Sequence, residues 1–416
     1  MTTQRRTRPA TRRQFGLPAL VLGALVVAAL AAIGLGAVAM HARVSAQTPA
    51  QGLDDVTGDA VAGHRFSLLD FEFGAVFSHW LGDLGAVLSG RHEDGPAADA
   101  LVRRYFDLRT DLAEARAASR SDTVIARLEA ERAAIENRVE RILEHRVGDE
   151  LRRSGFARPL PLFGDQALLW PPVDVELTRP PRVLTVSPRE EIRIARSVLL
   201  DPELSLPEMM RLEAEVEADG RWSALVQGIG GLGSYPAIVH EARSYAATVN
   251  TIAHEWTHNY LFFYPLGFHF FDSRELRTMN ETVANMVGDE IAESLQRAHP
   301  AVRPRELPTA DRTESDAVLA QLRRDVDALL AAGRIEDGEA LMEATRLELV
   351  DLGRNFRRIN QAFFAARGVY ADTAASSSPI GALLLALRGE ADSLAAFIAI
   401  VREFDSLAEL EAAVQG

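Results

Sequence analysis

The chain has 416 residues, of which 47% are apolar and 25% charged, a balance typical of globular rather than disordered proteins. It contains no cysteine, which excludes disulfides, iron–sulfur clusters and thiolate metal sites, so any metal must be held by His, Asp or Glu. The net charge is −14, and residues 1–46 carry six arginines and no acid, so the remainder is more acidic still. An acidic body argues against nucleic acid as a partner.

The N-terminus predicts a membrane-directing segment. A basic tail over residues 1–15 precedes an uncharged apolar run over residues 16–40, which as a helix is long enough to span a hydrocarbon core of about 30 Å. The basic flank favours the cytoplasm, so we expect a single-pass anchor in a bacterial cell membrane, with the rest of the chain outside the cytoplasm. Export with cleavage of the signal is the alternative, because Arg12-Arg13 resembles a twin-arginine signal and Val44-Ser45-Ala46 a cleavage site.

The next part of the chain is predicted to be a linker over residues 41–65 and a helical region over residues 66–156. From Ala97 to Arg153 there is no proline, and apolar residues recur at helical spacing. Ser121 and Asp122 interrupt this pattern with residue types that favour a helix N-terminus. We therefore expect a helical hairpin that packs within the molecule, with partner binding as the alternative.

A group of prolines follows, and residues 157–300 are predicted to form the core of the protein, followed by a helical C-terminal subdomain over residues 301–416. The predicted fold class is α+β and predominantly helical, with a small mixed sheet. The expected elements of the core are strands over Val173–Leu177, Arg182–Val186 and Ile192–Leu199, a helix over Leu206–Ala218, a glycine-interrupted strand over Ser223–Val239, and helices over 243–264 and 273–297. The subdomain is expected to contain helices starting near Thr313, running from Glu336 to Arg367, and, as a pair, following Pro379.

The sequence HEWTH, residues 254–258, lies in the first of the two adjacent core helices. His254 and His258 are four residues apart, so both imidazoles project from one helix face and can bind one metal ion, for which we predict Zn²⁺. Glu255 can then act as the general base on a metal-bound water. Within residues 244–271, Glu255 is the only acidic residue and arginine is absent, so this carboxylate is expected to be buried and functional.

A catalytic zinc ion usually has three protein ligands and one open position. Glu281 is the predicted third ligand, because it lies on the next helix and the turn containing Pro265 and Gly267 lets that helix pack back on the first. The weaker candidates for this ligand are His269, Glu275, Asp289 and Glu290.

These residues resemble the gluzincin group of zinc metallopeptidases. The similarity rests on HEWTH and on the sequence NETVA at residues 280–284, and it covers residues 223–297. It implies a zincin-like core with an active-site helix and a glutamate helix, with zinc bound by both histidines and Glu281, and Glu255 as the base. Thermolysin-like members have an aspartate four residues after the glutamate ligand, where this chain has Asn285. Its side-chain oxygen could still accept a histidine N–H and so orient a ligand.

Two further features are expected near such a site. The segment Leu225–Val239 before the zinc helix is either an edge strand that pairs with a peptide substrate or a glycine-rich turn. A hydrogen-bond donor should stabilise the developing oxyanion, and Tyr370 is the preferred candidate, with Tyr260, Tyr264 and His269 as alternatives.

The function predicted from these motifs is hydrolysis of a peptide or protein substrate by a zinc-dependent peptidase that contacts the membrane through its N-terminal helix. Two alternatives stay open. One is a non-catalytic, membrane-tethered scaffold with a structural or vestigial metal site, and the other is a metal-dependent hydrolase that acts on a substrate other than a peptide.

Overall fold

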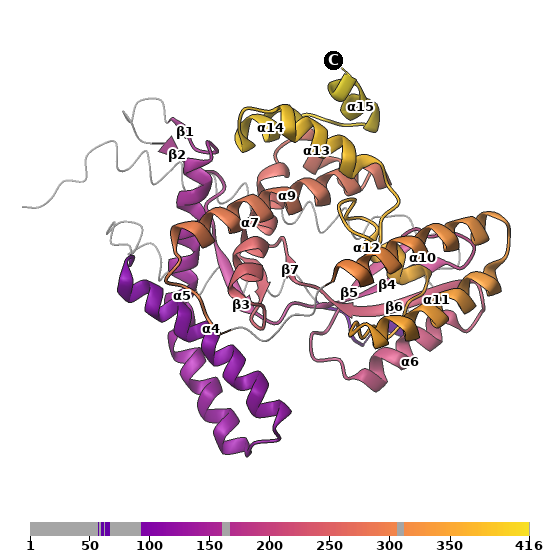
Figure 1. Ribbon diagram of the computed structural model, residues 1–416, viewed down its shortest axis with the longest axis horizontal. Helices are drawn as coiled ribbons and strands as arrows, with labels where there is room; N and C mark the ends of the chain where they lie inside the picture. Colours follow the sequence, from indigo (N-terminus) through magenta and orange to yellow (C-terminus); the bar gives the residue numbers. More distant parts are fainter. Residues whose placement is uncertain are drawn as a thin grey trace, which may run out of the picture. The chain divides into compact units, whose positions relative to one another are not determined.

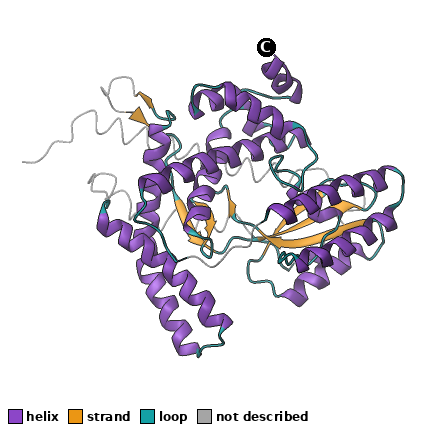
Figure 2. Cartoon of the chain, in the orientation of Figure 1, coloured by secondary structure: helices purple, strands orange, loops and turns teal. Residues whose placement is uncertain are grey.

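The computed structural model describes residues 57, 60, 61, 63–66, 93–159, 167–305 and 312–415. These parts are mostly helical, with two three-stranded sheets and one two-stranded ribbon of β1 (Arg158–Pro159) and β2 (Ala167–Leu168), as Figures 1 and 2 show. The predicted α+β class with predominant helix is confirmed at this level.

The first long elements form a helical hairpin of α4 (Pro96–Ala117) and α5 (Asp122–Arg153), as predicted for this region. The buried side chains in the first part of α4 and the second part of α5 belong to one hydrophobic core with those of α7 (Tyr245–Leu261) and α9 (Arg274–Ala298), whereas those nearer the turn of the hairpin form a separate cluster. The hairpin therefore packs directly on the helices that carry the histidine motif and Glu281.

The first sheet is mixed, with the strand order β3-β8-β7. In it, β3 (Val175–Thr178) is parallel to β8 (Ala237–His240), and β8 is antiparallel to β7 (Gly231–Leu232). Because β8 lies in the middle, β3 and β7 are the edge strands. β8 leads almost directly into α7, so this sheet sets where the histidine helix begins.

Helix α5 closes the outer edge of β3. Glu144 accepts a hydrogen bond from the backbone N–H of Val175 at 2.9 Å, and Glu140 accepts one from that of Leu177 at 2.8 Å. Residues four apart on a helix are separated by about 6 Å along its axis, and alternate residues of a strand by about 6.6 Å. The two spacings agree well enough for one helix to satisfy successive outward-facing N–H groups of the strand.

The second sheet is antiparallel, with the strand order β5-β4-β6. Its strands are β4 (Arg182–Pro188), β5 (Arg196–Leu200) and β6 (Trp222–Gly228). Helix α6 (Leu206–Glu217) lies along the β6 edge. Glu213 and Glu217 of α6 accept hydrogen bonds from the N–H groups of Val226 and Ala224 at 2.6 and 2.9 Å. The edge of β6 is thus closed in the same way as that of β3. Residues 64–66 pair with β5 at the opposite edge.

Residues 312–415 are helical, as expected for the C-terminal subdomain. The helices are α10 (Thr313–Ala331), α11 (Ile335–Asp351), α12 (Gln361–Arg367), α13 (Ile380–Glu390), α14 (Leu394–Val401) and α15 (Leu407–Gln415). The predicted single helix from Glu336 to Arg367 is wrong, because Gly353 takes a left-handed φ of 76° and Asn360 caps a new helix by accepting from the N–H of Phe363 at 2.9 Å. Three helices, instead of the predicted two, follow Pro379.

The predicted single-pass location in a membrane is not supported by the structure. Across the described ranges, no helix has both the length and the apolar character that crossing a bilayer requires. Residues 1–15 and 16–40, on which the prediction depended, lie outside those ranges, as does most of the predicted linker. The prediction is therefore corrected: the described part of the chain contains no helix that could span a membrane.

Candidate metal centre

Helix α7 passes through the core of the protein, as its lack of charge predicted. It begins after Ser244, whose hydroxyl accepts a hydrogen bond from the N–H of Ala247 at 3.3 Å. Most of its side chains are buried, including those of His254 and Glu255. A surface helix would instead have a polar face, so the motif lies on an internal helix.

Helices α7 and α9 pack side by side and antiparallel (Figure 1). Near the start of α7, Gly288 lies against Asn250, and a Cβ added at position 288 would stand 2.9 Å from the Asn250 backbone oxygen. Near the end of α7, His258 contacts Asn280. The glycine allows the helices to approach closely, and this register places Glu281 opposite the two histidines.

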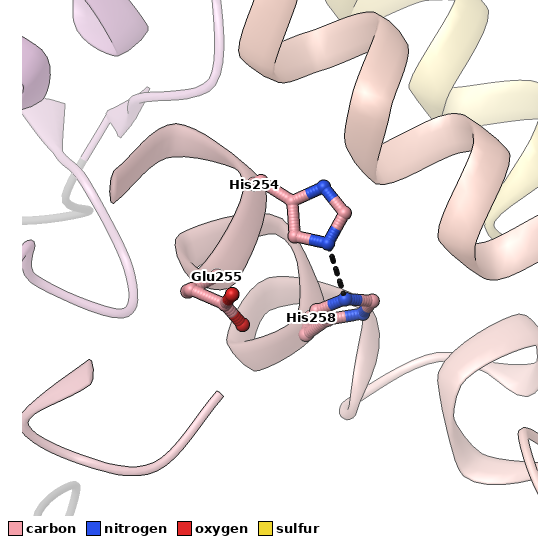
Figure 3. Close-up of side chains that lie close together, drawn as sticks. All are labelled: His254, Glu255 and His258. Carbon is pink, nitrogen blue, oxygen red and sulfur yellow. Dashed lines mark hydrogen bonds between the residues drawn. The ribbon is translucent and has the colours of Figure 1, made fainter. Parts of the chain in front are cut away.

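Three donor atoms from these helices form a compact triangle. His254 Nε2 and His258 Nε2 are 3.0 Å apart, and Glu281 Oε2 is 3.5 Å from each of them. The dashed line in Figure 3 joins the two imidazole nitrogens. A triangle with these sides has a circumradius of about 1.9 Å, slightly less than the zinc–ligand distance of about 2.0–2.1 Å. A point about 0.7 Å from the plane is therefore at ligand distance from all three atoms.

The chemistry of these donors also fits a metal ion. Glu281 Oε2 is buried and accepts no hydrogen bond from the residues that the structure describes. A buried carboxylate oxygen without a partner is unfavourable, and a cation inside the triangle would supply one. His254, Glu255 and His258 likewise form a group whose possible ligand atoms lie within 4.8 Å of one another. Of the two glutamates we assign the ligand role to Glu281, because its oxygen faces both imidazoles at equal distance.

Protons and a metal ion compete for this triangle. Burial disfavours the imidazolium of His258, but the charge and hydrogen bonding of Glu281, the charge of Glu255 and the hydrogen bond to Asn280 together outweigh burial and raise the pKa of His258. Burial alone would raise the pKa of Glu281, but the two histidines outweigh it and lower that pKa well below its usual range. Without a metal, His258 therefore holds a proton and Glu281 is ionised, and binding of a metal would release that proton.

Asn280, not Asn285, contacts a histidine of the triangle. His258 Nδ1 lies 2.7 Å from Asn280 Oδ1, and because that oxygen can only accept, Nδ1 must donate. In the neutral imidazole that a metal would require, the lone pair is therefore on Nε2, inside the triangle. The predicted orienting role of Asn285 is corrected, since its side-chain amide donates to both oxygens of Asp372 at 3.1 and 3.2 Å. The sequence could have singled out Asn280 as an orienting residue, because it directly precedes the proposed ligand Glu281.

The carboxylate of Glu255 lies beneath the edge strand β7. A Cβ added at Gly231 would stand 2.4 Å from Glu255 Oε1, and one at Gly233 would stand 3.5 Å from Oε2. The glycines of this segment thus make room for the carboxylate. The segment forms a short edge strand, and in the described residues no strand pairs with its outer side. The predicted segment Leu225–Val239 is therefore not one strand: it contains the end of β6, the two-residue edge strand β7 and most of the central strand β8, joined by turns.

Tyr370, in the segment after α12, also reaches this site. Its ring centroid lies 6.3 Å from that of His254. The charge of Glu281, then burial, then the charge of Glu255 raise the pKa of Tyr370 well above its usual value. The phenol therefore stays protonated and can donate a hydrogen bond within the site.

The other predicted candidates lie in separate interactions. The hydroxyl of Tyr260 accepts a hydrogen bond from Arg402 at 2.6 Å, and Tyr264 packs beside Tyr260. The remaining alternatives are also accounted for: His269 pairs with Asp272, Glu290 pairs with Arg388, Asp289 accepts from Asn250, and Glu275 is exposed.

Two arginines near the site were missed by the sequence reasoning. Arg243 is partly buried before the start of α7, where burial lowers its pKa and the charges of Glu255 and Tyr370 oppose that effect. Arg277 lies on α9 one turn before Glu281, a spacing that could have singled it out. Both place positive charge close to the proposed ligands and base.

Comparison of the chain with family models, curated proteins and solved structures found no match. The resemblance to gluzincins therefore stays a hypothesis based on the two motifs. The functional argument depends on the geometry of the triangle and on the residues around it.

Proposed function

We propose that this protein is a zinc-dependent peptidase of the gluzincin type. The observation that carries the proposal is the triangle of His254 Nε2, His258 Nε2 and Glu281 Oε2, whose sides of 3.0, 3.5 and 3.5 Å suit one tetrahedral zinc ion. These three residues would hold the ion, and Asn280 would fix the tautomer of His258. A zinc ion bound there supplies an acidified water molecule and polarises the carbonyl group to be cleaved.

Glu255 acts as the general base in this proposal. Its carboxylate is buried beside the triangle but is free of the ligand role, so it can accept a proton from water as the oxygen–carbon bond forms. It then transfers that proton to the leaving amine as the carbon–nitrogen bond breaks. Burial raises the pKa of Glu255, while the neighbouring histidines and Arg243 lower it.

Tyr370 and β7 bind the substrate in the same proposal. The phenol of Tyr370 donates to the carbonyl oxygen, where negative charge develops. The open edge of β7 lies directly above Glu255 and can pair with the backbone of an extended peptide. A peptide held along this strand would place a backbone carbonyl next to the triangle and the base, which is why we favour a peptide substrate.

The decisive test separates metal binding from turnover. We expect the wild-type protein to bind about one zinc ion per chain. Glu255→Gln should keep the zinc and reduce hydrolysis of a peptide library by about 10²–10⁴-fold. His254→Ala should lose the zinc, and Glu275→Gln, at an exposed glutamate on α9, should change neither property.

Zinc content is measured by elemental analysis, and cleavage by mass spectrometry. Turnover that persists in Glu255→Gln would refute the role of the base. Absence of bound metal under zinc-replete conditions would instead favour a scaffold protein. Bound zinc with hydrolysis of esters but of no peptide would favour a different metal-dependent hydrolase.

A further inference from the structure

Arg277 lies beside the metal triangle on a platform of aromatic rings. Its guanidinium carbon is 5.4 Å from the ring centroids of both Phe270 and Phe271. Phe270 packs edge-on against the imidazole of His258, with centroids 6.0 Å apart and an interplanar angle of 86°. This series of contacts places the cation on the His258 side of the triangle.

Arg277 is not paired directly with any acidic side chain among the described residues. Its guanidinium forms no salt bridge and no hydrogen bond there, although the residue is partly buried. Burial lowers the pKa of Arg277, and the charge of Glu281 is what opposes this effect. In the proposed function Glu281 is a metal ligand, so its charge is already neutralised. An arginine remains protonated in such surroundings, and a partly buried cation without an anion is unfavourable.

The charges around the triangle are distributed unevenly. A divalent ion would be balanced by Glu281 and Glu255, which leaves two arginines without compensation. Arg243 faces Glu255 and Tyr370, whereas Arg277 lies on the His258 side. Two further carboxylates act on the His254 side: Asp289 is influenced by the charges of Asp372 and His254, and Asp372 is bound by the amide of Asn285. An anion that enters the site on the His258 side is therefore drawn towards Arg277.

We propose that Arg277 determines specificity by binding a carboxylate of the peptide substrate, either the C-terminal carboxylate or an aspartate or glutamate side chain. This inference rests on the proposed peptidase function. The planar guanidinium can form two parallel hydrogen bonds with a carboxylate. One helical turn separates Arg277 from Glu281, about 6 Å along the helix, which corresponds to about two residues of an extended peptide. The recognised carboxylate therefore lies within about two residues of the cleaved bond.

Three matched pools of acetylated hexapeptides test this proposal. The first pool lacks aspartate and glutamate and has a free C-terminal carboxylate, the second is its C-terminal amide, and the third is amidated and contains one glutamate per peptide. Binding is measured with zinc-loaded Glu255→Gln protein, which should not turn the peptides over, and cleavage with the otherwise wild-type enzyme. Both are repeated with Arg277→Gln, with Arg277→Lys and with Arg274→Gln, an exposed arginine on the same helix.

We expect one of the two carboxylate pools to be preferred over the neutral pool by roughly 10- to 100-fold, the usual strength of a hydrogen bond to a charged group. Which pool is preferred identifies the source of the carboxylate. Arg277→Gln should reduce the ratio to about one, Arg277→Lys should give an intermediate ratio, and Arg274→Gln should leave it unchanged. Thermal melting and zinc content verify that each variant is folded and loaded.

A ratio near one in the parent protein, or a preference that survives Arg277→Gln, would overturn the proposal. If Arg277→Gln does not fold, an undiminished ratio in Arg277→Lys would overturn the bidentate pairing. Cleavage of no pool by the wild-type enzyme would count against the peptidase function, and the binding ratio would still decide the role of Arg277. The two failures are therefore distinguishable.

Discussion

Replacing Asn280 by alanine should weaken zinc binding without removing a ligand. Asn280 Oδ1 is 2.7 Å from His258 Nδ1, and the residue is 1% exposed, so water cannot readily replace the lost acceptor. Loss of such an orienting hydrogen bond usually lowers metal affinity by about 10- to 100-fold, or about 1.4–2.7 kcal/mol. Asn280→Asp keeps the acceptor and adds negative charge, so it should bind zinc at least as tightly as the wild type.

The same substitution also affects folding, and the two effects must be separated. The side-chain amide of Asn280 donates to the backbone oxygen of Leu266 at 3.3 Å. Loss of this bond leaves a buried acceptor unsatisfied, at a cost of about 1–3 kcal/mol in the free energy of unfolding. The decrease in the free energy of unfolding should also be observed in the metal-free protein, with excess chelator present. The decrease in zinc affinity is a separate effect and should not depend on the stability of the metal-free protein.

Competition with a chromophoric zinc chelator measures the affinity, and urea denaturation of the metal-free protein measures the stability. Asn285→Ala is the matched control, because the structure pairs Asn285 with Asp372 and predicts a change of less than about threefold. The opposite pattern, with weaker zinc binding in Asn285→Ala and normal binding in Asn280→Ala, would refute the register of α7 and α9 described above.

Three further predictions concern other parts of the molecule. Tyr370→Phe should lower kcat by about 10²–10³-fold with unchanged zinc affinity, as measured by steady-state kinetics and chelator competition; an unchanged kcat would remove Tyr370 from the mechanism. Burial raises the pKa of Glu140 from 4.5 to about 8, so the folded protein retains a proton that the unfolded chain loses near pH 4.5, and stability should fall as the pH rises between these values. Glu140→Gln should remove this pH dependence and should be more stable than the wild type at pH 8 by about 2–4 kcal/mol, as measured by urea denaturation. The same change of stability with pH in both proteins would contradict this account. Gly288→Ala should lower the melting temperature and the zinc affinity together, because the new Cβ would meet the Asn250 backbone at 2.9 Å; a higher melting temperature would show that the helices can separate freely.

The sequence predicted the parts of the site that depend on spacing within one helix. The four-residue separation of His254 and His258 sets their common face, and the absence of neighbouring charge indicated that Glu255 is buried. Glu281 was accessible to similar reasoning because Pro265 and Gly267 indicated a reversal of the chain between the two helices, where the structure has the short helix α8 (Pro265–Phe268). These features are local, so they require little knowledge of how the rest of the chain packs.

Features that depend on the relative placement of two elements could not be predicted in this way. Asn280 and Asn285 are about 140° apart around α9, and which of them meets His258 is decided by the register between the helices. Gly288 sets that register through contact with another helix, and no spacing within the sequence reveals it. Arg277 was overlooked for a related reason, because its lack of a directly paired acidic side chain is a property of its three-dimensional surroundings.

The break between α11 and α12 is a different kind of error. Gly353 and Asn360 are residue types that commonly end and begin helices, so the local signals for the break were present in the sequence. Helical spacing of the apolar residues outweighed them in the prediction. Closer attention to these signals would have divided the predicted helix correctly.

The glutamates that bind the outer N–H groups of β3 bear on how the protein can be shortened. A truncated chain that starts at residue 157, where the catalytic core was predicted to begin, would lack Glu140 and Glu144 together with the rest of α5. Val175 and Leu177 would then present unpaired N–H groups to solvent, and such an edge attracts strands from other molecules. We therefore expect the truncated protein to aggregate even though it retains every proposed zinc ligand, so that the hairpin is required for solubility as well as for packing.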